Sequence, residues 1–187
     1  MLEELLNLDR ELFLYLNGLG TPIWDDFWIY LSRTLSFITI PIYMLVIFLS
    51  YRIFGTKNTL IILGTTTLLL LTTEQLSVLF KQNIGRLRPC HDNIIKEIYR
   101  NVGNHCGGQY SYFSAHAANS SAFAVFFGNL LSKKYRGLFY FLLFWSLLVS
   151  YSRIYIGVHF PLDVITGLFF GILLGYLFST LLKKKLP

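Results

Sequence analysis

Three short polar clusters each lie at the end of a long apolar segment of this chain. In chain order they comprise Lys81, Arg86, Arg88 and Pro89; Ser114, Ala115 and His116; and Ser152, Arg153, His159 and Asp163. Ionisable residues at the ends of apolar segments are candidates for function, because placing them in lipid is costly. Together the clusters supply cations that can hold an anion and imidazoles that can act as nucleophile, acid or base.

The third cluster has the most specific spacing. His159 and Asp163 are four residues apart, and Pro161 marks a helix start between them. The carboxylate can therefore hold one ring nitrogen and leave the other with a free lone pair, as an imidazole nucleophile requires. Ser114 is placed to cap a helix whose first amides would form an anion site.

Each cluster taken alone has a simpler explanation. The cations Lys81 and Arg88 could anchor a helix end among lipid headgroups, and His116 could be a structural hydrogen-bonding residue. An aspartate at a helix start is common in itself. A site is predicted only because the clusters occur together.

The elements that must position these residues are membrane helices. The chain has 187 residues, of which 54% are hydrophobic and 14% charged, about half the charged share of soluble domains. Five stretches are apolar enough to span a bilayer: Phe27 to Tyr51, Thr59 to Phe80, His116 to Leu131, Leu138 to Gly157, and Pro161 to Leu182. The fold class predicted is an all-α integral membrane protein, with a single domain over residues 1–187.

Residues 1–20 are predicted to form an amphipathic helix on the membrane surface. Leu5, Leu12, Phe13 and Leu16 recur at helical spacing among charged residues. A secretion signal is disfavoured because the segment is acidic and lacks an uninterrupted apolar centre. A short spanning helix is the remaining alternative, and it would have to bury those charges.

The distribution of basic residues predicts the orientation. One face collects Arg52, Lys57, Lys133, Lys134, Arg136 and Lys183 to Lys185. The excess of Lys and Arg in cytoplasmic loops assigns this face, with the C-terminus, to the cytoplasm. The polar clusters and the loop 90–113 then lie outside, on the periplasmic or exterior side of a bacterial inner membrane. The lysine tail is interpreted as a stop-transfer signal, and no nucleic-acid partner is predicted.

Both cysteines, Cys90 and Cys106, fall in this external loop, where a disulfide would persist in an oxidising compartment. Free thiols are the second possibility. A zinc site is the third, because His91 and His105 adjoin the cysteines, but the spacing matches no trusted zinc pattern.

Two charged residues lie inside predicted spans. Arg33 and Glu74 fall at similar depth beneath the external face, by a rise of about 1.5 Å per residue. Each would be costly alone in lipid, so the two are predicted to pair, or Glu74 to turn toward the catalytic cations.

The three clusters resemble the type 2 phosphatidic acid phosphatase (PAP2) superfamily. That family has a lysine six residues before Arg-Pro, then Pro-Ser-Gly-His, then Ser-Arg followed at fixed spacing by His and Asp. This chain matches with Lys81, Arg88, Ser114, His116, Ser152, Arg153, His159 and Asp163. It departs from the pattern at Phe113 and Ala115, where the family usually has Pro and Gly. The match spans more than half of the chain.

The resemblance implies a lipid phosphatase without cofactor or metal. His159 would attack phosphorus, Asp163 would orient it, and His116 would protonate the departing oxygen. A second group of residues, Lys81, Arg88, Ser114, Ala115 and Arg153, would hold the phosphoryl oxygens. Fixed cations can stabilise the spread negative charge of phosphoryl transfer.

The sequence does not name the lipid. Undecaprenyl diphosphate is the first expectation, followed by a phosphate of lipid A, and then by phosphatidylglycerol phosphate or phosphatidic acid. A carrier that binds a lipid or anion without hydrolysis is the rival class, although it would not need the His159 and Asp163 pair. The oligomeric state is not indicated.

Overall fold

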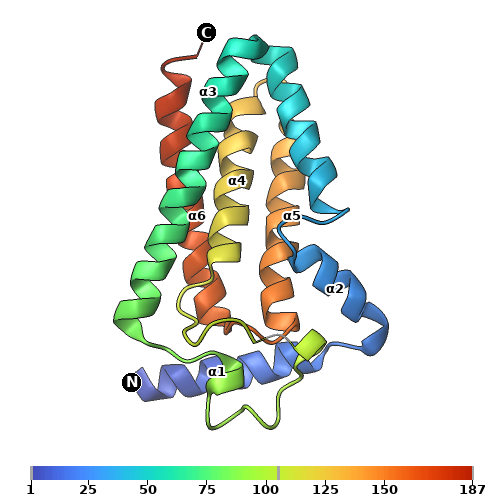
Figure 1. Ribbon diagram of the computed structural model, residues 1–187, viewed down its shortest axis with the longest axis vertical. Helices are drawn as coiled ribbons and strands as arrows, with labels where there is room; N and C mark the ends of the chain where they lie inside the picture. Colours follow the sequence, from blue (N-terminus) through green and yellow to red (C-terminus); the bar gives the residue numbers. More distant parts are fainter. Residues whose placement is uncertain (1, 105, 187) are drawn as a thin grey trace.

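The computed structural model describes residues 2–104 and 106–186, and the regular elements of this part of the chain are all helical. Six α-helices form the fold (Figure 1): α1 Leu2–Gly18, α2 Asp25–Ser32, α3 Thr39–Ile84, α4 Ala115–Leu131, α5 Arg136–Tyr155 and α6 Pro161–Lys183. Three single turns of 3₁₀-helix join them: η1 Pro22–Trp24, η2 Pro89–His91 and η3 Val102–Asn104. The all-helical class predicted from the sequence is confirmed.

Helix α3 is two helices that meet at Gly55. This glycine has φ 73° and ψ 174°, a backbone conformation that only glycine adopts readily. The chain therefore turns, and Figure 1 shows the first limb rising toward the bend and the second descending from it. The long helix thus contains two antiparallel apolar limbs.

The predicted first span, Phe27 to Tyr51, is wrong in its boundaries. Helix α2 ends at Ser32, and α3 does not begin until Thr39. Side-chain bonds stabilise this break, since Thr39 Oγ1 accepts from Ser36 N at 2.9 Å. Among the described helices, α3, α5 and α6 are long and apolar enough to cross a membrane. Helix α4 has 17 residues and is therefore too short to be counted with them.

Helices α4 and α6 pack closely through small residues. Gly171 faces Ala118 and Ser121, and a Cβ atom added to it would collide with the Ser121 hydroxyl and the Ala118 carbonyl. Gly167 and Gly175 meet α4 backbone in the same way. Small residues let membrane helices approach closely, so this contact fixes the start of α6 against the start of α4.

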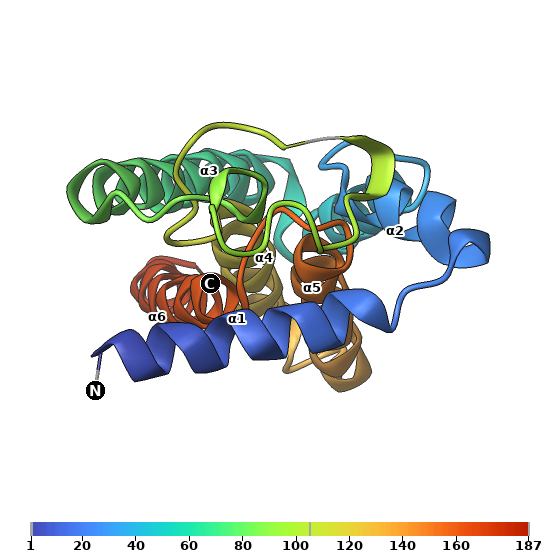
Figure 2. The same cartoon turned by 90° about the horizontal axis from the view of Figure 1, so that it is seen from below.

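Helix α1 lies across the end of the bundle, beneath α5 and α6 (Figures 1 and 2). Buried polar side chains hold it there. The Asn17 amide donates to the carbonyls of Ile154 and Tyr155 at 3.2 and 2.9 Å, near the end of α5. Asp9 accepts from the Leu162 amide at 2.9 Å, at the start of α6. Each side chain thus satisfies backbone groups that a helix end leaves unpaired.

Candidate active site

The three polar clusters meet at the end of the bundle that α1 covers. Lys81 is in the last turn of α3, His116 in the first turn of α4, and Arg153 in the last turn of α5. His159 lies in the turn before α6, and Asp163 in the first turn of that helix. Figure 1 shows these helix ends on the same side of the molecule.

Local features of the sequence end or begin each helix at the required point. Gly85, with φ 66°, caps α3 by donating from its amide to the Lys81 carbonyl at 3.1 Å. Ser114 caps α4, and its hydroxyl accepts from the Ala117 amide at 3.4 Å. The Ser114 amide in turn donates to the Asp163 carbonyl at 2.9 Å. This bond ties the second cluster directly to the third.

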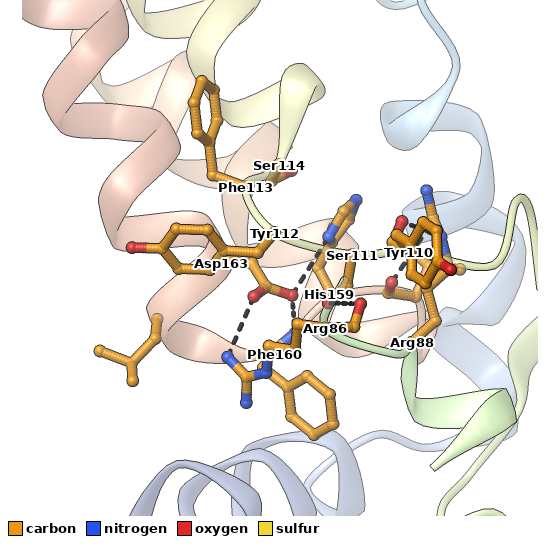
Figure 3. Close-up of polar contacts among 12 residues, drawn as sticks. Arg86, Arg88, Tyr110, Ser111, Tyr112, Phe113, Ser114, His159, Phe160 and Asp163 are labelled. Carbon is orange, nitrogen blue, oxygen red and sulfur yellow. Dashed lines mark hydrogen bonds and ion pairs between the residues drawn. The ribbon is translucent and has the colours of Figure 1, made fainter. Parts of the chain in front are cut away.

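His159 and Asp163 form a buried pair, as their spacing predicts. His159 Nδ1 lies 3.4 Å from Asp163 Oδ2, and the two side chains are 2% and 0% exposed. The same oxygen accepts from the Phe160 amide at 3.0 Å, and Figure 3 shows the carboxylate between the imidazole and Arg86. Burial, reinforced by the charges of Arg88 and Arg153, lowers the pKa of His159 well below its usual 6.5. A lowered pKa favours the neutral imidazole, and with Nδ1 facing the carboxylate the other ring nitrogen, Nε2, is the candidate nucleophile.

The cations around this pair are held by main-chain and hydroxyl groups. Arg88 donates from Nε to the Tyr110 carbonyl and from a terminal nitrogen to the Val158 carbonyl, both at 3.2 Å. Arg153 donates to the Ser32 hydroxyl, while its buried Nε has no hydrogen-bond partner in the described part of the chain. A buried N–H without an acceptor is costly, and a phosphoryl oxygen would satisfy it.

His116 lies at one end of a cavity of about 370 Å³ between α2, α3, α4 and α5. It interacts electrostatically with Arg153, His159, Lys81 and Arg88. The far part of the cavity is apolar, lined by residues such as Ile47, Leu63, Phe127 and Trp145. Polar groups from Ser32, Arg33, Glu74 and Asn119 also line it.

Two charged residues in the site were not predicted as site residues. Arg86 donates to Asp163 Oδ1 at 3.0 Å and to Asp9 Oδ2 at 2.5 Å. Arg86 belongs to the first polar cluster, and its position two residues before Arg88 was the available signal. Asp9 resembles the other charges of the amphipathic helix, so its burial, at 4% exposed, has no sequence signal.

The predicted pair of Arg33 and Glu74 does not form. Arg33 lies at the break after α2 instead of inside a span, and its guanidinium is 5.1 Å from the centre of the Tyr30 ring. Glu74 accepts from the Asn119 amide at 3.1 Å. Both residues line the cavity. They do not pair because the chain breaks after Ser32, where a continuous span was expected.

The departure at Phe113 is accommodated by aromatic packing. Its ring is fully buried, with its centre 5.1 Å from that of Phe170 and 5.3 Å from that of Phe80. These contacts restrain the loop before α4, where the family usually has a rigid proline. Ala115 is buried in the first turn of α4.

The loop between α3 and α4 contains a disulfide. The structure joins Cys90 to Cys106, with Cα atoms 5.9 Å apart. His91 Nε2 lies 3.5 Å from Cys106 Sγ; the fourth zinc candidate, His105, is outside the described residues. A disulfide takes both thiolates that a zinc site would use.

Known proteins resemble this chain over most of its length. The sequence is 37% identical to lipid A 4'-phosphatase of Porphyromonas gingivalis over 94% of this chain and 73% of that protein. It is 32% identical to lipid A 4'-phosphatase of Bacteroides thetaiotaomicron over 98% of this chain and 81% of the relative. An undecaprenyl-diphosphatase of Sulfolobus acidocaldarius is 43% identical, but over only 36% of this chain and 32% of its own length.

Solved structures share the fold. The crystal structure of Aquifex aeolicus LpxE superposes with a TM-score of 0.70 and 25% identity, covering 92% of this chain and 95% of that one. A PAP2 type phosphatidylglycerolphosphate phosphatase from Bacillus subtilis gives a TM-score of 0.75 at 20% identity, covering 97% and 87%. The PAP2 superfamily model matches residues 58–187. The chain therefore belongs to the PAP2 superfamily of membrane lipid phosphatases.

Proposed function

We propose that this PAP2 phosphatase removes a phosphate from a lipid A-type glycolipid through a phosphohistidine intermediate. The observation that carries the proposal is the similarity to two lipid A 4'-phosphatases over nearly the whole chain. The match to an undecaprenyl-diphosphatase is confined to about a third of the chain. Lipid A was the second expectation from the sequence, and these relatives favour it over undecaprenyl diphosphate.

In the first step, His159 Nε2 forms a bond to phosphorus as the bond to the leaving oxygen breaks. Asp163 holds the Nδ1 proton and stabilises the positive charge that develops on the ring. His116 donates its proton to the departing oxygen. In the second step, His116 takes a proton from water, which attacks phosphorus and releases phosphate and free His159.

The cations provide the electrostatic part of catalysis. Lys81, Arg88 and Arg153 all interact with His159. The buried Arg153 Nε has no acceptor among the described residues, which supports a role in binding a phosphoryl oxygen. Backbone amides near Ala115, at the start of α4, add a helix N-terminus to the same site. Such fixed charges need no rearrangement when the transition state forms.

The cavity supports a substrate with an apolar portion and a polar leaving group. His116, the proposed acid, lines it together with Glu74 and Asn119, which can hydrogen-bond to hydroxyl or amide groups of a sugar. The apolar remainder suits acyl chains. A polyprenyl diphosphate would present only phosphate oxygens to Glu74, an unfavourable contact between like charges.

We further propose five membrane crossings: the two limbs of α3, then α4, α5 and α6. Helix α1 would lie in the outer interface, because Leu5, Leu8, Leu12 and Tyr15 are exposed on it. The basic groups of the α4–α5 turn and of the C-terminus lie at the end opposite α1, and by the positive-inside rule they face the cytoplasm. The site would then open to the cell exterior or periplasm.

Phosphate release from purified protein in detergent, with a panel of lipids, tests the substrate. We expect lipid A to be hydrolysed faster than undecaprenyl diphosphate, phosphatidylglycerol phosphate or phosphatidic acid. The reverse order would overturn the assignment. A chelator should leave the rate unchanged, because the proposed steps use side-chain cations.

Trapping of radiolabelled phosphate on His159 separates hydrolysis from carriage. A carrier would bind the lipid without forming the covalent intermediate. Acid-labile label that is lost in His159→Ala supports the phosphatase, and lipid binding without label supports the carrier.

A further inference from the structure

A chain of buried ion pairs joins the surface helix to the proposed nucleophile. Asp9 Oδ2 accepts from Arg86 at 2.5 Å, and Arg86 donates from its other terminal nitrogen to Asp163 Oδ1 at 3.0 Å. Asp163 Oδ2 faces His159 Nδ1 at 3.4 Å. Asp9 and Asp163 are 2% and 0% exposed in their side chains, and Arg86 is 13% exposed.

The position of Arg86 is fixed from both sides. Its guanidinium lies 4.0 Å from the centre of the Phe160 ring, an arrangement that stabilises a cation, and Figure 3 shows it between that ring and Asp163. Asp9 is fixed as well, because its second oxygen accepts from the Leu162 amide at 2.9 Å. Little water is available to screen these charges, so their sum acts on His159.

The charge balance of this group has a consequence for catalysis. Asp9 and Asp163 each contribute one negative charge and Arg86 one positive charge, so these three side chains together carry one net negative charge, in addition to the positive charges of Lys81, Arg88 and Arg153 near the same imidazole. Nδ1 keeps its proton while Nε2 bonds to phosphorus, so the ring becomes cationic. Without Asp9, Arg86 would cancel the charge of Asp163 just where it must stabilise that cation.

We propose that Asp9 is a positioning residue of the phosphatase, which neutralises Arg86 so that Asp163 presents a net negative charge to His159. This inference rests on the proposed role of His159 as nucleophile. It gives α1 a part in the chemistry as well as in membrane attachment.

The test compares single-turnover formation of phosphohistidine in three variants, with the radiolabelled lipid phosphate that the wild type hydrolyses fastest. Asp9→Asn keeps an oxygen for the Leu162 amide but removes the charge, and it should slow the step roughly tenfold with KM unchanged. The double variant Asp9→Asn with Arg86→Gln restores one net negative charge and should recover most of the rate. A merely structural role for Asp9 predicts no such recovery.

Arg10→Gln is the matched control. Arg10 is the next residue of α1 and pairs with Asp92 of the external loop at 2.9 Å, without a bond to Asp163. Because its ion pair is partly exposed, Arg10→Gln should lower the thermal midpoint in detergent no more than Asp9→Asn does, and it should leave the phosphorylation rate unchanged. Unchanged phosphorylation in Asp9→Asn, or a double variant no faster than Asp9→Asn, would overturn the proposal.

Two further outcomes are distinguishable. If Asp9→Asn does not fold, the double variant decides: a rate within about threefold of wild type supports charge balance, and a loss of tenfold or more contradicts it. Absence of phosphohistidine in the wild type would instead refute the proposed function, whatever the variants do.

Discussion

The two faces of α4 are packed in opposite ways. Toward α6, Ala118 and Ser121 meet glycine so closely that no Cβ atom fits between the helices. Toward α2, α3 and α5, His116, Asn119 and Phe123 line a cavity of about 370 Å³. Helix α4 therefore packs tightly against α6 on one face and lines a cavity on the other.

The tightly packed face can hold reacting residues in place, whereas the cavity on the other face can accommodate a substrate. The Ser114 amide donates to the Asp163 carbonyl beside this close contact, so the proposed catalytic pair is fixed against the start of α4. Reaction geometry must be held within fractions of an ångström. The lipid portion of a substrate needs only apolar volume, and looser packing by larger side chains provides it.

The largest expected effect comes from removing the proposed nucleophile, which lies on the closely packed side of α4. His159→Ala should lower turnover by more than the roughly 10²- to 10⁴-fold expected for loss of an acid or base, because no covalent intermediate can form. Phosphate release measures it. The control is His91→Ala, an exposed histidine of the loop between α3 and α4, which should keep wild-type turnover. Comparable loss in both variants would contradict the assignment of the nucleophile.

A methyl group tests the close contact itself. Gly171→Ala should destabilise the protein by about 1–3 kcal/mol, because the new Cβ atom forces α4 and α6 apart. The same change at Gly64, where nothing lies within 4 Å, should be neutral or stabilising by up to about 1 kcal/mol. Thermal unfolding in detergent measures both. Equal midpoints would show that α4 and α6 are not packed too closely for a methyl group at Gly171.

Filling the cavity should affect binding more than chemistry. Leu63→Trp places a larger ring among the lining residues, and we expect KM for a long-chain lipid phosphate to rise roughly tenfold, the effect of losing one to two buried methylenes. Leu68→Trp is the control, since that side chain is 58% exposed and lies outside the cavity. Steady-state kinetics with lipids of two chain lengths separate the variants. An equal effect on short and long chains would argue against an acyl site.

The smallest effect is a dependence of stability on pH. Burial lowers the pKa of His159 below 6.5 in the folded protein, so below that pH the unfolded chain takes up the proton first. Stability is then complete above about pH 6.5 and falls as the pH drops toward the folded pKa, by at most about 1.4 kcal/mol per pH unit. Thermal midpoints between pH 7 and 5 should fall less steeply in His159→Gln than in wild type. Parallel curves would show that the imidazole is not buried in its neutral form.

Features that depend on neighbouring residues could be predicted from the sequence alone. Helical spacing places His159 beside Asp163, Ser114 caps α4, and apolar length predicts membrane helices; none of these needs distant contacts. The resemblance to the family motif also predicted that the three distant clusters meet, because the family's motif residues form one site.

The remaining features follow from contacts between residues that are distant in the sequence. The bend at Gly55, the break after Ser32 and the cavity depend on how helices pack, which local periodicity does not encode. Asp9 and Arg86 are 77 residues apart, and on an isolated amphipathic helix Asp9 is one solvated charge among several. Burial against the start of α6 gives it a specific partner, because a charge removed from water must find a counter-charge.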